Sequence, residues 1–160
     1  MTLHRQEDAR ALFAEIERAL ESKTQRISEL LDGLPQGSDP VSAAARRERL
    51  MEVKLLVAYC KRKGGLILAE KSDPDFNRER LELVFNETAA DLRSLDIECA
   101  ALVETSEVLP AATVSVLYDC LYDFAAAAFS ARNPVLMLFV RDGQSGEVEM
   151  RAVLESDGAG

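Results

Sequence analysis

Apolar residues recur at three- and four-residue steps through two long segments in the first half of the chain, 3–34 and 40–63. This spacing is typical of helices with a buried face. The segment between them, 33–40, carries two glycines and two prolines, which favour the end of one helix and the start of the next. Two long helices joined by a short loop predict an antiparallel helical hairpin. The stripe on the first helix consists of Leu12, Ile16, Ala19, Leu20, Ile27, Leu30, Leu31 and Leu34.

The second helix is apolar on more than one side. A surface of this width predicts two contacts, one with the first helix and one with another partner. We therefore expect two hairpins to pair as a homodimer with a four-helix bundle. The basic triplet 61–63 followed by Gly64 and Gly65 predicts the end of this helix, with an apolar continuation of unassigned type over 66–70. The apolar positions are Ala44, Leu50, Met51, Val53, Leu55, Leu56, Val57, Tyr59 and Cys60.

In the second half, the pattern alternates between helix and strand periods. Helices are predicted over 76–95 and 110–129, and strands over 97–103, 135–140 and 148–154. The last two strands are joined by Asp142-Gly143 and Ser145-Gly146, pairs that suit positive φ in a hairpin loop. This order predicts an α+β fold, in which helices cover one side of a mixed sheet.

A polar segment, 71–75, is the expected boundary between the two halves. We therefore predict a helical hairpin domain over 1–70 and an α/β domain over 71–160.

Composition narrows the function classes. The formal net charge is −9, from 19 basic and 28 acidic residues, which argues against general nucleic-acid binding because phosphate is repelled. Three separated cysteines and one histidine do not form a usual zinc site. The N-terminus is polar, and no apolar run of membrane-spanning length is expected. The sequence thus predicts a cytoplasmic protein with no membrane segment.

The basic residues concentrate on the second helix, against an acidic background. This concentration has two interpretations, a solvated face with helix-capping charges or a contact with an anion or an acidic partner. The residues are Arg46, Arg47, Arg49, Lys54, Lys61, Arg62 and Lys63.

Three groups of residues are candidates for chemistry. Asp119 and Asp123 lie one helical turn apart, a spacing at which two carboxylates can share Mg²⁺ or activate a hydroxyl, although acidic residues are also common on an exposed surface. The segment 156–160 contains glycines that let backbone amides approach a base or a phosphate, or it is a simple tail. His4, the lone histidine, is incidental or catalytic. The glycine patterns of common nucleotide sites and the nucleophile elbow are absent.

The order of elements, a helical hairpin followed by α-β-α-β-β and an Asp/Gly segment, resembles the core of a two-component sensor histidine kinase. The most specific local match is 55–68, LLVAYCKRKGGLIL, which is similar to a tyrosine, basic-triplet and apolar run in an atypical group of bacterial sensor kinases. The resemblance covers roughly 11–154. It implies that the hairpin is a dimerisation and phosphotransfer module and that the second half is an ATP-binding domain of the Bergerat (GHKL) type.

The resemblance also implies roles for single residues. Asp119 stands at the position of the catalytic glutamate, and Asp123 at that of the magnesium-binding asparagine. Ser156 replaces the base-recognising aspartate of the first glycine box. The other cofactor-binding positions of that box are Asp157, Gly158 and Gly160.

The family's lid and its second glycine box are missing. His4, the candidate phosphoacceptor, is followed by Arg5 where the family has an acidic residue.

Three hypotheses follow from these features. The first is a degenerate, dimeric scaffold or regulator of a two-component system that binds ATP and Mg²⁺ weakly or not at all. The second is a histidine phosphotransferase that uses His4 and takes a response regulator as its partner. The third is a fragment of an active, ATP-dependent kinase whose missing boxes follow residue 160.

Overall fold

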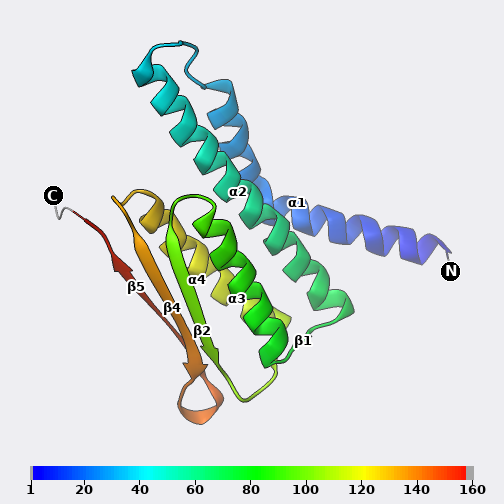
Figure 1. The fold of residues 1–160 in the computed structure, drawn as a ribbon. Helices are drawn as coiled ribbons and strands as arrows, with labels where there is room; N and C mark the ends of the chain where they lie inside the picture. Colours follow the sequence, from blue (N-terminus) through cyan, green and yellow to red (C-terminus); the bar gives the residue numbers. More distant parts are fainter. Residues whose placement is uncertain (1, 158–160) are drawn as a thin grey trace. The chain divides into compact units, whose positions relative to one another are not determined.

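The computed structural model describes residues 2–157, with side chains from Gln6 onward. It has an α+β fold in which a helical hairpin precedes a mixed sheet, as predicted (Figure 1). The chain divides into two compact units, Met1–Leu68 and Ala69–Gly160. The roles given above to 1–70 as a dimerisation domain and to 71–160 as a kinase-like domain stay predictions.

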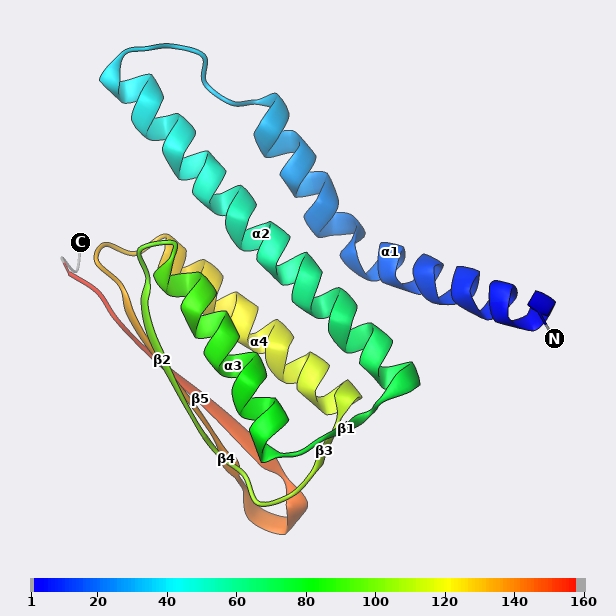
Figure 2. The same ribbon diagram turned by 45° about the vertical axis from the view of Figure 1, so that its right-hand side comes forward.

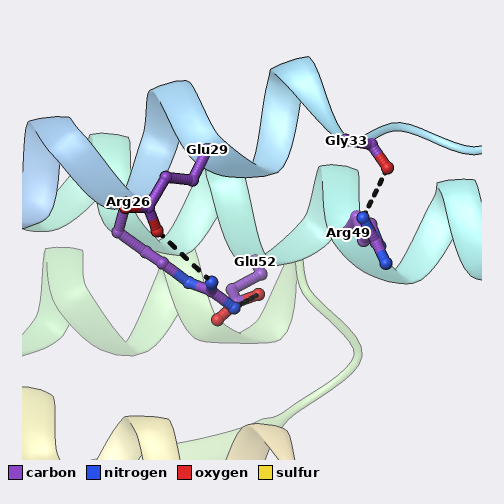
Figure 3. A network of polar contacts seen from close by, with 5 residues as sticks. All are labelled: Arg26, Glu29, Gly33, Arg49 and Glu52. Carbon is purple, nitrogen blue, oxygen red and sulfur yellow. Dashed lines mark hydrogen bonds and ion pairs between the residues drawn. The ribbon is translucent and has the colours of Figure 1, made fainter.

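The first unit is an antiparallel pair formed by α1 (Thr2–Asp32) and α2 (Pro40–Ser72). Polar contacts fix the register of the pair. Arg26 Nη2 lies 3.4 Å from Glu52 Oε2, and Arg49 donates to the carbonyl of Gly33 at the end of α1 (Figure 3). Further along, the ammonium of Lys23 lies 5.5 Å from the ring centroid of Tyr59.

The N-terminal part of α1 diverges from α2, as both views show (Figures 1 and 2). Thr24 Oγ1 donates to the carbonyl of Leu20 at 3.2 Å, a back-bond of the kind that bends helices. Ile16 is still close to α2, because its Cγ2 lies 3.8 Å from the point where a Cβ on Gly64 would sit. The helix residues before Ile16 therefore extend past the paired part of the hairpin.

The predicted end of α2 at Gly64-Gly65 is wrong, because the helix continues to Ser72. Leu66, Ile67 and Ala69 are buried. Burying a large apolar side chain gives about 1.5–3 kcal/mol, whereas a glycine inside a helix costs about 1 kcal/mol. Burial therefore outweighs the two glycines, and the uncertain stretch 66–70 is helical.

The second unit contains two sheets. Strand β1 pairs antiparallel with β3, while β4 lies between β2, to which it is parallel, and β5, to which it is antiparallel. The mixed sheet is the predicted one. In chain order, the elements are β1 (Asp75–Phe76), α3 (Arg78–Arg93), β2 (Glu98–Glu104), β3 (Leu109–Pro110), α4 (Ala111–Phe129), β4 (Val135–Asp142), the short 3-10 helix η1 (Gln144–Gly146) and β5 (Val148–Glu155).

One face of the mixed sheet is buried beneath helices. Leu136, Leu138 and Val140 alternate along β4 with exposed or half-buried residues, and each is at most 1% exposed. Helices α3 and α4 lie on the same side of the sheet (Figures 1 and 2), where α3 contacts β2 and α4 contacts β4 and β5. The core of this unit lies in this layer, and its largest fully buried side chains are Phe85, Leu81, Leu92, Ile97, Leu121, Leu136, Leu138, Val114 and Val140.

Two local predictions need correction. The third helix begins at Arg78 and not at residue 76, because Asn77 caps it by accepting a hydrogen bond from the Arg80 N–H at 2.8 Å. In the β4–β5 loop, positive φ occurs at Ser145 and Gly146, whereas Gly143 has a φ of −94°. The predicted loop is thus present, but Gly143 of the Asp142-Gly143 pair does not adopt the left-handed region.

Among the described helices, α4 alone is long and apolar enough to cross a membrane by length and composition. A core helix of a folded domain passes the same test, and α4 buries residues such as Val114, Leu121 and Ala128 in its unit. The finding is therefore weak evidence for a membrane span.

Candidate functional site

The two candidate carboxylates of the second unit lie on α4. Asp119 and Asp123 are one turn apart, and Asp119 is half-buried whereas Asp123 is exposed. Both lie outside the set of α4 residues that is buried in the core. The predicted proximity of the two residues along the helix is present, and their chemical roles stay predictions.

The segment after β5 is held by the loop between α4 and β4. The Asp157 N–H donates to the Arg132 carbonyl at 2.9 Å, and Asn133 Nδ2 donates to Asp157 Oδ2 at 2.9 Å. Asn133 has a φ of +47°, a left-handed conformation that asparagine tolerates well. We call these two hydrogen bonds the Asp157 clasp. The backbone N–H and one carboxylate oxygen of Asp157 are therefore already bonded within the unit.

The remaining predicted positions have less structural definition. Ser156 is exposed next to the Asp157 clasp. Gly158 and Gly160 lie outside the described residues. His4 lies in the first turns of α1, and its side chain is outside the described part, so its catalytic assignment stays a prediction.

The fit of these residues to a Mg²⁺–ATP complex is poor. Within residues 2–157, no three His, Cys, Asp or Glu side chains gather into a group that could hold a metal ion. Mg²⁺ can bind through one or two carboxylates when phosphates complete its shell. Asp123, however, would add a second carboxylate charge one helical turn from Asp119, and Asp157 already accepts a hydrogen bond from Asn133.

Five of the seven basic residues named above for α2 divide into two sets, and the other two, Arg62 and Lys63, are half-buried. Arg46 Nε donates to the Pro35 carbonyl at 2.9 Å, and a second nitrogen of Arg46 donates to the Gly37 carbonyl. Arg49 donates to the Gly33 carbonyl, as Figure 3 shows. These two arginines therefore close the loop of the hairpin. Arg47, Lys54 and Lys61 are exposed.

The sequence did not point to a hollow on the outer face of the mixed sheet, opposite the helices. Its volume is about 410 Å³. Its lining combines apolar and charged side chains, and Arg141 Nε pairs with Glu149 Oε2 at 3.1 Å. The period-two pattern predicts which side chains of each strand face away from the helices. The pairing of β2 with β4 is also needed to show that the lining residues lie side by side. The lining includes Leu102, Glu104, Phe139, Arg141, Glu149 and Arg151.

Two thiols are poorly suited to nucleophilic chemistry. Burial raises the pKa of Cys99 to about 11, although the nearby Arg93 acts in the opposite direction. Burial also raises the pKa of Cys60, against the charge of Lys23. Because the thiolate is the nucleophile, both groups stay largely protonated at neutral pH.

No protein-family model matches the chain, and no curated protein matches it at a significant level. The chain has a distant structural similarity to a bacterial phosphotransferase whose structure was solved at 1.7 Å, with 19% sequence identity and a TM-score of 0.38. The match covers 95% of this chain and 68% of the other. At this TM-score, the similarity carries no argument about function.

Proposed function

We propose that the chain is a dimeric scaffold or regulator of the histidine-kinase type, in a two-component system of the cytoplasm, and that it has little or no affinity for ATP. The Asp157 clasp is the observation that carries the proposal. By resemblance, the base of ATP would meet the segment that begins at Ser156. The adjoining Asp157 bonds to the loop at Arg132 and Asn133, which favours a structural role for this segment.

The side chains of α4 and of the last segment support the same proposal. A serine hydroxyl at position 156 is a single short group where a carboxylate would receive the amino group of adenine. Asp119 is one methylene shorter than a glutamate, and catalysis is sensitive to small displacements of a reacting group. A chain that keeps the helices and the sheet but has other residues at positions 119, 123 and 156 retains surfaces for protein contacts without the side chains that would bind ATP.

We expect calorimetric titration of the intact chain with Mg²⁺–ATP to give no binding heat at nucleotide concentrations up to about 1 mM. A dissociation constant above this concentration corresponds to a binding free energy weaker than about −4 kcal/mol. A micromolar dissociation constant for the wild type would contradict the proposal. The matched variant combines Asp119→Glu, Asp123→Asn and Ser156→Asp. Binding by this variant alone would support the three replacements as the cause of the low affinity.

We further propose that the dimer forms through α1. Phe13 is 61% exposed and lies before Ile16, in the part of α1 that extends past the paired hairpin. It continues the apolar stripe of Ile16 and Leu20 towards the N-terminus. A second hairpin would bury this ring in a four-helix bundle.

The dimer proposal predicts that Phe13→Glu converts the protein to a monomer, because the variant places a charge in the apolar contact. Light scattering with size-exclusion chromatography would give the 17.6 kDa mass of one chain for this variant and twice that mass for the wild type. Val57→Glu, at a 50% exposed position on α2, is the control and should stay dimeric. A monomeric wild type would show that the dimer is wrong.

A further inference from the structure

One side of α2 is exposed from Ala43 to Leu68, and we call it the outward stripe. Its members are spaced by three or four residues, so they line a single side of the helix. Each of them is exposed, while Leu55, Leu56 and Tyr59 on the opposite side are buried. The outward stripe consists of Ala43, Arg47, Leu50, Lys54, Val57, Lys61, Gly65 and Leu68.

The outward stripe has a heptad order. Its cations, Arg47, Lys54 and Lys61, are seven residues apart, and so are Leu50 and Val57, which lie between them. In heptad terms, the cations occupy a positions and Ala43, Leu50 and Val57 occupy d positions, the two positions that face a partner helix in a coiled coil. Leu68 falls at the next a position, so the cationic heptad order covers residues 43–61.

Charges are separated around α2. Its three glutamates, Glu48, Glu52 and Glu70, lie on the side opposite the outward stripe by helical geometry. Glu52 contacts Arg26 of α1 there. The outward stripe contains no acidic residue, although the whole chain carries a net charge of −9. The concentration of basic residues in the stripe is therefore a local feature of an acidic chain.

A second copy of the stripe does not complement it in a parallel pair. In a parallel pair, each a position faces the same position of the partner, so Arg47, Lys54 and Lys61 would each meet a like charge. Like charges in contact across an interface are costly. A helix with carboxylates at a and leucine or valine at d instead gives an opposite charge at every cationic layer.

We propose that the outward stripe binds an amphipathic helix of a partner protein that carries acidic residues at heptad a and apolar residues at heptad d. This inference deepens the scaffold role proposed above, because it names the chemistry of the partner. It does not depend on nucleotide binding or on Phe13, so its test can fail while those proposals stand.

The test uses the intact chain and a fluorescein-labelled, four-heptad peptide with glutamate at a and leucine at d. Fluorescence anisotropy should show saturable binding that weakens with added salt, as expected for charges near the surface. The double variant Lys54→Glu/Lys61→Glu should weaken binding at least about tenfold, since each pair changes from attraction to repulsion. A peptide with lysine at a should bind this variant and thereby restore the pairing.

The matched control reverses two exposed cations of α1, Arg10→Glu/Arg18→Glu, which changes the net charge by the same amount and should alter binding less than about twofold. Circular dichroism of both double variants checks that the helices are intact.

The proposal is overturned if the peptide does not bind, or if glutamate and lysine peptides bind the wild type equally. It is also overturned if Lys54→Glu/Lys61→Glu alters the oligomeric mass, which would assign the stripe to a second copy. Capture of the chain by anionic vesicles without peptide binding would assign it to a membrane surface.

Discussion

Phe85→Ala should reduce the free energy of unfolding by about 3–5 kcal/mol, the range for removal of a buried aromatic ring. Phe85 is 0% exposed and lies at the centre of the buried side of α3, between Leu81 and Leu92. Domains of this size have total stabilities of about 5–15 kcal/mol, so the loss is a large share. Urea unfolding followed by circular dichroism measures the change.

Leu83→Ala is the matched control, since Leu83 lies on the same helix and is 57% exposed. Surface substitutions usually change stability by less than about 0.5 kcal/mol, apart from special sites. Hydrogen exchange of the β4 amides should rise in Phe85→Ala and not in Leu83→Ala, because α3 and α4 cover that side of the sheet. Similar losses in both variants would mean that the assigned buried side of α3 is wrong.

The sheet was well predicted because period two is a strong local signal. The alternation of Leu136, Leu138 and Val140 with more exposed residues corresponds to one buried face, and the observed β4 differs from the prediction only at its C-terminal end. The two-residue strands β1 and β3 were missed. A pair that joins residues 75–76 to 109–110 depends on contacts distant in sequence and leaves no periodic pattern.

The candidate site was only partly predictable. The spacing of Asp119 and Asp123 follows directly from helical periodicity, because both lie within one helix. The Asp157 clasp joins residues 24 positions apart and depends on the left-handed backbone of Asn133. No local pattern identifies that pair before the α4–β4 loop and the end of β5 are placed together.

The sequence showed that α2 is apolar on more than one side, but the exposed fractions of its side chains were needed to tell which side packs against the fold. The prediction of a second contact did not say which side faces outward. The buried positions of Leu55, Leu56 and Tyr59 identify the opposite side as exposed, and this places Lys54 and Lys61 in the outward stripe.

Gly65→Pro should destabilise the protein by about 3 kcal/mol or more, because α2 continues through this position. Proline removes the N–H that bonds to the carbonyl four residues earlier, and its ring clashes with that carbonyl. Had the helix ended at Gly64-Gly65, a terminating glycine would adopt the left-handed region, where alanine is strained as well as proline. The comparison of Gly65→Pro with Gly65→Ala therefore discriminates between the predicted and the observed end of α2.

Gly65→Ala is the paired variant and should have the opposite sign. A Cβ at Gly65 meets no atom within 4 Å, so alanine adds no clash and gives about 0.5–1 kcal/mol through its higher helix propensity. Urea unfolding and the helical circular dichroism signal of both variants measure these changes. A proline variant that loses less than about 1 kcal/mol, or an alanine variant that is less stable than the wild type, would contradict a continuous helix. The opposite signs follow from one cause, because an α-helix at residue 65 favours alanine over glycine and excludes proline.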